Sequence, residues 1–124
     1  MQNRIMYKQY LQVGGFRVMQ IDATCVAGPQ EIVLEYLLAN KFGVRVCLHA
    51  GGVGLCEAVR RFAMFDYLAV SGQWDDRVIE YVDNQHEYFV HPTEIVNGRY
   101  KASTAPGSGV DMKLEAAERY LYKG

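Results

Sequence analysis

The sequence VRVCLHAGGVGLCE, residues 44–57, predicts a short buried strand, a glycine-rich turn and the first turn of an amphipathic helix. The strand ends at His49. Parallel α/β proteins place their chemistry at the carboxyl ends of strands, where the chain turns into a helix. Because histidine also has an unperturbed pKa close to physiological pH, His49 is a candidate catalytic residue. The alternative is a buried structural histidine, the commoner role for a histidine beside apolar residues.

The size and composition of the chain indicate one globular domain. It has 124 residues, of which 50% are hydrophobic and 22% are charged, and its formal net charge is −1. A chain of this length buries a modest hydrophobic core. The near-neutral charge gives no electrostatic basis for binding nucleic acid or an anionic membrane. No apolar run approaches the roughly 18 residues of a membrane span, so we expect neither nucleic acid nor a membrane as a partner.

The N-terminus and the cysteines bear on the compartment. The first residues, MQNR, lack the apolar core of a signal peptide, so we expect a cytoplasmic protein. Cys25, Cys47 and Cys56 are odd in number and contain no C-x-x-C pair. Neither a disulfide framework nor a zinc site is therefore predicted.

Helices and strands alternate in the first half of the chain. Apolar spacing, glycines and one proline predict the order helix, strand, helix, strand, helix over residues 3–13, 16–21, 28–43, 44–48 and 55–65. Such short cycles imply a parallel sheet with right-handed crossovers. The predicted fold class is α/β.

Asp22 and His49 are predicted to lie side by side. Each directly follows one of the two predicted strands, and neighbouring parallel strands lie about 4.8 Å apart. A carboxylate at this place can accept a hydrogen bond from one imidazole nitrogen, which leaves the other nitrogen free as a general base. Alternatively, Asp22 only caps the loop that follows it, as aspartate commonly does. The spacing is compatible with both roles.

The second half of the chain has a different pattern. It predicts a helix, a hairpin and a last helix over residues 75–89, 93–102 and 112–122. His86 and Glu87 are expected on the solvent side of the first of these helices. The hairpin is predicted because Asn97-Gly98 suits a type I′ turn.

The glycines after His49 do not form a dinucleotide-binding motif. The G-x-G-x-x-G pattern would need glycine or alanine where Glu57 stands. The sequence also contains no P-loop, no G-x-S-x-G motif and no histidine–carboxylate cluster with metal-ligand spacing. A backbone site for a carboxylate or a phosphate at this helix N-terminus stays open. The residues alone therefore predict no cofactor.

Several short motifs carry a resemblance to a known family. They are QID at 20–22, CLHAGGVGLCE at 47–57, FDY at 65–67, VSG at 70–72, RVIEYVD at 77–83, NGRY at 97–100 and TAPG at 104–107. They resemble the C-terminal part of the L-fuconate dehydratases, in the mandelate racemase-like subgroup of the enolase superfamily. The resemblance implies an α+β capping domain, a modified TIM barrel and dehydration of acid sugars with magnesium. It makes residues 1–72 the C-terminal part of the (β/α) barrel, with its last two βα units, and residues 73–124 an extension that packs on the barrel or the capping region.

The resemblance also implies roles for three residues. His49 matches the catalytic base and acid, Asp22 its dyad partner, and Glu80 an active-site acid near the substrate carboxylate. Without the family, Glu80 would be interpreted as an exposed charge on the predicted helix. The implied chemistry abstracts a proton next to a carboxylate, and metal and cationic groups stabilise the resulting enediolate. The histidine then delivers a proton to the departing hydroxyl.

The chain lacks residues that the family uses for activity. The family's lysine pair and three metal-binding carboxylates have no counterpart in it, since Lys8 and Lys41 lie in predicted helices. Leu48 stands where family members tend to have proline, and the loop after Asp22 is divergent. We therefore expect magnesium in the full-length family but no cofactor for this chain alone.

The predicted sheet is also incomplete. Two strand–helix units cannot close a barrel and leave two strand edges unpaired. We therefore expect a homo-oligomer or an N-terminal partner chain, with an acid-sugar substrate bound only when other strands complete the barrel. The leading hypothesis is the C-terminal part of an L-fuconate dehydratase-like lyase that is inactive alone. The alternatives are a non-catalytic interaction or scaffold protein and one half of a split enzyme.

Overall fold

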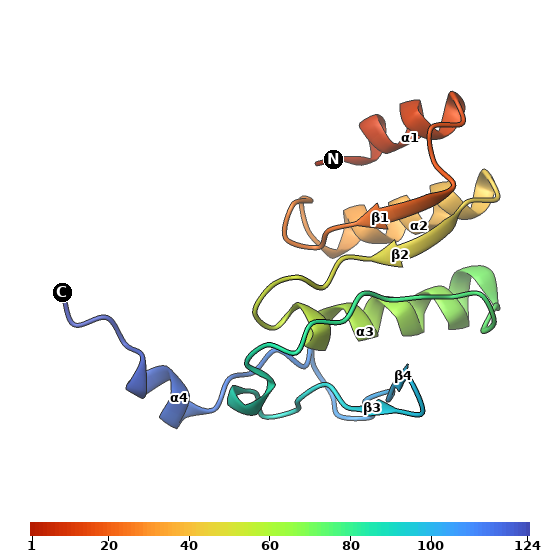
Figure 1. Cartoon of the computed structure of the whole chain (residues 1–124). Helices are drawn as coiled ribbons and strands as arrows, with labels where there is room; N and C mark the ends of the chain where they lie inside the picture. The colour runs from red at the N-terminus through yellow and green to blue at the C-terminus, as the bar shows by residue number, and fades with distance from the viewer.

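Helices and short strands alternate in the computed structural model, which describes residues 1–124 (Figure 1). In chain order the elements are α1 (Arg4–Gln12), β1 (Val18–Ile21), α2 (Pro29–Lys41), β2 (Arg45–Leu48), α3 (Leu55–Phe65), the π-helical turn η1 (Asp66–Ser71), the 3₁₀ turn η2 (His86–Tyr88), β3 (Ile95–Val96), β4 (Arg99–Tyr100) and α4 (Leu114–Arg119). The first five follow the predicted order, and the α/β class is confirmed. None of the helices is long and apolar enough to cross a bilayer.

β1 and β2 pair as a parallel sheet, with Ile21 opposite Leu48. Alternate residues of both strands are buried, and these are Met19, Ile21, Val46 and Leu48. Gln20 on the opposite face is exposed, and Cys47 is half-buried. Because successive strand side chains point to opposite faces, one face of the sheet is packed and the other is open.

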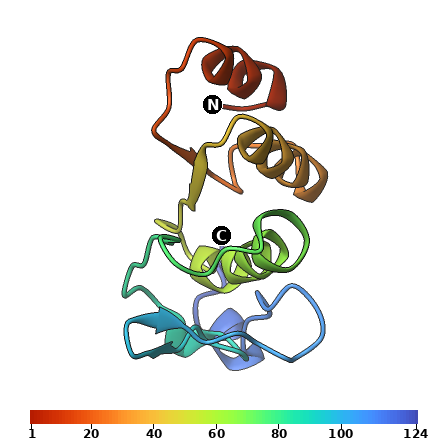
Figure 2. The same cartoon turned by 90° about the vertical axis from the view of Figure 1, so that its right-hand side faces the viewer.

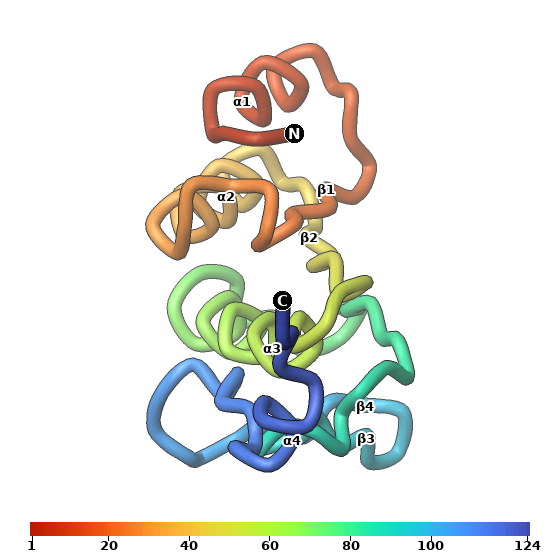
Figure 3. Tube along the Cα trace, turned by 90° about the vertical axis from the view of Figure 1, so that its left-hand side faces the viewer, coloured from red at the N-terminus to blue at the C-terminus, as the bar shows by residue number.

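α1, α2 and α3 stand in a column beside the strands, as opposite views show (Figures 2 and 3). Their apolar side chains meet those of the strands in one core, to which the helices contribute Tyr7, Leu11, Ile32, Tyr36, Ala39, Leu55, Cys56 and Val59. Local signals set the helix starts. The Asn3 side chain accepts hydrogen bonds from the N–H groups of Ile5 and Met6. Pro29 occupies the first turn of α2, where its missing N–H costs nothing.

The prediction of a helix over residues 75–89 is wrong. Residues 73–85 run beside β2 without helical structure, and the Glu80 N–H donates to the Leu48 carbonyl (3.2 Å). The free edge of β2 offers unpaired backbone groups, and pairing with them outweighs the weak helical preference of this segment. His86, expected on the solvent side, is only 13% exposed in its side chain because it packs against α3.

The end of the chain also differs in part from prediction. The predicted hairpin is present as β3 and β4, and Asn97 (φ +52°) and Gly98 (φ +72°) take the left-handed conformations that a type I′ turn needs. The last helix, predicted over 112–122, is shorter, and α4 projects away from the body with the C-terminus (Figure 1). Only Ala116 of α4 is buried, and Leu114 is 81% exposed. The expected apolar stripe therefore has nothing to pack against within this chain.

Two arginines of α3 bind the backbone of the extension. The Arg60 guanidinium donates to the His91 carbonyl (2.6 Å), and that of Arg61 donates to the carbonyls of Ser103 (2.7 Å) and Ala105 (2.5 Å). Charge-assisted hydrogen bonds of this kind are stronger than neutral ones. α3 thus connects the sheet to the last third of the chain, while the predicted domain boundary at residue 72 stays a prediction.

Candidate active site

His49 and Asp22 lie next to each other at the carboxyl ends of β2 and β1. The strand register pairs Ile21 with Leu48, and the His49 N–H donates to the Ile21 carbonyl (2.9 Å), so the residues that follow the strands come together. The His49 Nε2 lies 3.9 Å from the Asp22 Oδ2. Both residues come after the strands on the side of the open sheet face. The exposed fraction of the side chain is 33% for His49 and 27% for Asp22. The strand-end juxtaposition that the sequence predicted is therefore present.

The Asp22 carboxylate caps the loop after β1. It accepts hydrogen bonds from the Thr24 N–H (2.9 Å) and hydroxyl (2.7 Å) and from the Cys25 thiol (3.0 Å). Burial raises the pKa of Asp22, but the hydrogen bonds from Thr24 and Cys25 lower it by more, so the net pKa lies below its ordinary value. The alternative role as a loop cap is thus fulfilled. At 3.9 Å the expected hydrogen bond to His49 is not formed, although the two groups stay at ion-pair distance.

Glu80 makes the direct contact with His49. The His49 Nδ1 lies 2.5 Å from the Glu80 Oε2, and the same oxygen accepts the Ala50 N–H (2.7 Å). Because an ionised carboxylate can only accept hydrogen bonds, this network places a hydrogen on Nδ1. In the neutral imidazole the lone pair is then on Nε2, which has no hydrogen-bond partner in the chain. This is the tautomer that a general base needs.

Reasoning from the residues alone missed Glu80, and only the family resemblance selected it. Its neighbours Val78, Ile79 and Val82 are β-branched, which favours an extended segment over a helix. In the structure the Glu80 backbone is held on two sides, by its N–H to Leu48 and by the Tyr100 hydroxyl, which donates to the Glu80 carbonyl (2.6 Å). The β-branched residues signal an extended segment, but they do not point to Glu80 itself.

The glycine turn after β2 brings backbone directly against the imidazole. A Cβ added at Gly51 would lie 2.5 Å from the His49 Cε1 and 3.0 Å from its Nε2. Real Cβ contacts are essentially never that short, so the ring occupies space that only glycine leaves open. The turn then enters α3 through Gly54 in the left-handed conformation (φ +73°).

The three candidate residues do not fit a magnesium site. No group of three or more histidine, cysteine, aspartate or glutamate side chains is arranged to hold a metal ion. The carboxylate oxygens that face His49 already accept hydrogen bonds from Ala50 and Cys25. Magnesium needs a near-octahedral set of oxygens, which an imidazole between two carboxylates does not supply. The metal ligands that the family resemblance implies are therefore not provided by these residues.

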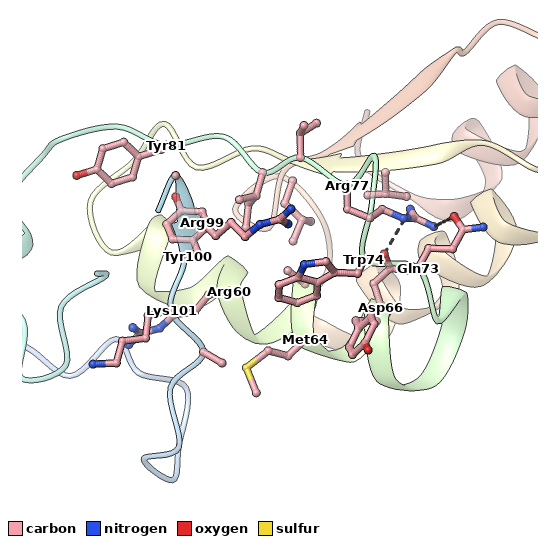
Figure 4. Close-up of a pocket in the computed structure, with 18 of the residues that line it drawn as sticks. Arg60, Met64, Asp66, Gln73, Trp74, Arg77, Tyr81, Arg99, Tyr100 and Lys101 are labelled. Atoms are coloured by element: carbon pink, nitrogen blue, oxygen red, sulfur yellow. Dashed lines mark hydrogen bonds and ion pairs between the residues drawn. The ribbon is translucent and has the colours of Figure 1, made fainter. Parts of the chain in front are cut away.

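A cavity of about 980 Å³ is lined in part by sequence neighbours of the candidate residues, among them Leu48, Ile79 and Tyr81 (Figure 4). It opens between α3, residues 73–81 and the β3–β4 hairpin, and most of its lining is apolar. The Arg99 guanidinium lies over the Trp74 ring, 5.1 Å from its centroid, and Arg77 pairs with Asp66 (3.3 Å). None of the three candidate catalytic residues themselves lines this cavity.

A parallel strand pair backed by helices, with polar side chains at the carboxyl ends of the strands, is the arrangement of one part of a (β/α) barrel. Residues 1–117 match the family described as Enolase C-terminal domain-like, and the chain belongs to this family. The partial-barrel interpretation of the fold is thereby confirmed.

Relatives are similar to nearly the whole of this chain. It is 43% identical over 120 residues to Mitochondrial enolase superfamily member 1 of Xenopus laevis and 42% identical over 123 residues to L-galactonate dehydratase of Hypocrea jecorina. These matches cover 97% and 99% of this chain and 27% of each relative. The crystal structure of human Mitochondrial enolase superfamily member 1 matches with a TM-score of 0.92 at 41% identity, over 97% of this chain and 27% of that one. The chain therefore spans about a quarter of the length of these relatives.

Proposed function

We propose that this chain contributes the histidine end of the active site of an acid-sugar dehydratase. The observation that carries the proposal is the state of His49, whose Nδ1 is fixed by Glu80 while Nε2 is left open beside Asp22. A general base at a strand end of an enolase-superfamily domain suits proton abstraction next to a carboxylate. The 42% identity to a protein named L-galactonate dehydratase supports the same reaction class.

The geometry suggests how the residues of this chain would act. The His49 Nε2 accepts the proton from the carbon next to the substrate carboxylate, and the imidazolium that forms keeps its Nδ1–H on Glu80. Asp22 has a lowered pKa, so it stays ionised and stabilises that positive charge from 3.9 Å. The imidazolium then returns a proton to the hydroxyl on the adjacent carbon. The C–O bond breaks, water leaves, and His49 is neutral again.

Other groups are needed to stabilise the negative charge of the intermediate. Magnesium, where family members bind it, would supply Lewis-acid stabilisation to the substrate carboxylate. The candidate residues here do not fit that ion, and Lys8 and Lys41 lie in α1 and α2. We therefore propose that groups outside residues 1–124 supply this stabilisation and that residues 1–124 alone are inactive.

The edges of the sheet also favour the proposal that a partner binds. β1 pairs only with β2, so the other edge of β1 has no strand beside it. The sheet face that carries Val18 and Gln20 is exposed. Unpaired edges attract further strands. We propose that a second copy or an N-terminal partner chain covers them. Light scattering over a concentration series should give a defined oligomer or a stoichiometric complex, and a monomer at all concentrations that binds no such partner would contradict this.

The substrate that we propose is L-fuconate, which is 6-deoxy-L-galactonate. It shares with L-galactonate the carboxylate and the carbons next to it, where the chemistry takes place. A site that dehydrates one acid would therefore present the same reacting groups to the other. Discrimination would depend on groups that face the far end of the sugar.

A chimera tests the proposal. The segment of Hypocrea jecorina L-galactonate dehydratase that matches this chain over 123 residues is replaced by residues 1–124, and dehydration of both acids is measured with magnesium. We expect turnover in the chimera, loss of at least about a hundredfold in its His49→Asn variant, and none in the isolated chain. A chimera that melts cooperatively at the temperature of the parent enzyme but dehydrates neither acid would overturn the proposal.

A further inference from the structure

His86 is held between two hydrogen-bond acceptors. Its Nδ1 lies 2.7 Å from the Glu57 Oε1, and its Nε2 lies 2.8 Å from the Val82 carbonyl oxygen. Glu57 is 1% exposed, and the same Oε1 also accepts the Thr93 N–H (2.9 Å). A carbonyl oxygen and an ionised carboxylate can only accept hydrogen bonds and cannot donate them. With Glu57 ionised, both ring nitrogens carry hydrogens and His86 is an imidazolium.

The surroundings of His86 are consistent with this charge. Burial lowers the pKa of His86, but the hydrogen bonds to Glu57 and Val82 raise it by more, and the net pKa lies above its ordinary value. The pKa of Glu57 is lowered because hydrogen bonds from His86 and Thr93 outweigh its burial. The titratable groups around the imidazole are Glu57 and Cys56 from α3, the stacked Tyr81 ring with its centroid at 5.6 Å, and Asp83.

We propose that His86, paired with Glu57, is a positioning residue for Glu80. Val82, whose carbonyl His86 binds, lies two residues after Glu80 in the same segment. The Glu57–His86 pair thus ties this segment to α3, while the Glu80 N–H ties it to β2. With the Tyr100 hydroxyl on the Glu80 carbonyl, the backbone is fixed on three sides. The carboxylate is thereby placed where it meets His49.

This inference rests on the role proposed above for Glu80, but its test measures position and not activity. The Ala50 N–H donates to the Glu80 carboxylate, and the Glu80 N–H donates to Leu48. Hydrogen exchange at these two amides therefore reports whether Glu80 is in place. The His49 N–H, bonded to Ile21 within the sheet, reports on the sheet alone.

The Glu57–His86 pair predicts a pH window. Since the pKa of His86 is raised in the fold, its contribution is fully present below its ordinary pKa of 6.5 and is lost as the pH rises through the raised value. At the acid end the contribution of Glu57 is lost as the pH falls through its lowered pKa. After correction for intrinsic exchange rates, protection at Ala50 and Glu80 should fall about tenfold above the pKa of His86, while His49 keeps its protection.

Variants separate positioning from general stability. At pH 6, Glu57→Gln and His86→Gln should lower protection at Ala50 and Glu80 about tenfold and remove its pH dependence, with Glu80→Ala as the reference for complete loss at Ala50. His91→Gln is the matched control, because this exposed histidine contributes only its carbonyl to Arg60. Unchanged exchange in folded variants, or an equal loss at His49, would overturn the proposal.

A second measurement needs no variant. The ¹⁵N shifts of the His86 ring in the wild-type chain should show two protonated nitrogens at pH 7, at a pH where free histidine is mostly neutral. A neutral imidazole there, with one ring nitrogen unprotonated, would contradict the inference even if the substitutions prevented folding.

Discussion

Replacing Gly51 by alanine is expected to separate His49 from Glu80 and, in an active chimera, to lower kcat/KM by about a hundredfold. The new Cβ would lie 2.5 Å from the His49 Cε1, so the ring has to turn or shift. The ring is fixed on its other side by the Nδ1 contact of 2.5 Å with Glu80, which the movement breaks. Gly51 does not have a left-handed backbone conformation, so alanine adds no backbone strain and the expected effect comes from the side-chain clash alone.

Gly52→Ala is the matched control for this substitution. Its Cβ would meet the buried Leu55 side chain, 2.9 Å from Cδ1, but no His49 atom lies within 4 Å of it, so any strain falls on the core and not on the imidazole. In the isolated chain, Gly51→Ala should change the His49 ring shifts and expose the Ala50 amide to exchange, and Gly52→Ala should do neither. If both variants kept the wild-type ring shifts, the steric account of this glycine would be wrong.

The parallel pair and its strand-end residues could be predicted because the evidence for them is local. Both strands are short apolar runs bounded by glycine or charged residues, and the register of β1 and β2 brings Asp22 beside His49. The short crossover through α2 leaves few other ways to arrange these strands. Here the residue pattern and the family resemblance selected the same two side chains.

The contacts of Glu80 and His86 could not be predicted in the same way, because they depend on partners far along the chain. Glu80 meets Ala50 across 30 residues, and His86 meets Glu57 across 29. A stretch with apolar residues at positions 78, 79, 81 and 82 suits a helix or an extended segment nearly equally well. The choice is made by the free edge of β2 and by a buried carboxylate on α3, neither of which local spacing reveals.

The largest stability effect is expected at Glu35, in the middle of α2. Glu35 is 0% exposed, and neither of its carboxylate oxygens has a hydrogen-bond partner. Burial, together with the nearby Glu31 carboxylate, raises its pKa to about 7. The folded state therefore holds a proton that the unfolded chain releases near its ordinary pKa of 4.5. Stability is highest below that value and falls as the pH rises through about 7.

Glu35→Gln should remove this dependence, because glutamine has nearly the same shape and no charge. We expect the variant to be more stable than the wild type at pH 8 by on the order of 2 kcal/mol, a value below the full linkage energy because water relaxes around an ionised carboxylate. At pH 5 the two proteins should differ little. Urea unfolding at both pH values measures the difference.

The exposed Glu87 gives the control, since Glu87→Gln should leave the pH dependence unchanged. The part of the slope that comes from the Glu57–His86 pair should survive in Glu35→Gln and disappear in His86→Gln, so the two buried groups can be separated by their variants. Equal stabilisation of Glu35→Gln at pH 5 and pH 8 would mean that the charge of Glu35 is not the cause. A destabilised variant at pH 8 would mean that the carboxylate has a partner, such as a group supplied by a second polypeptide in an assembly.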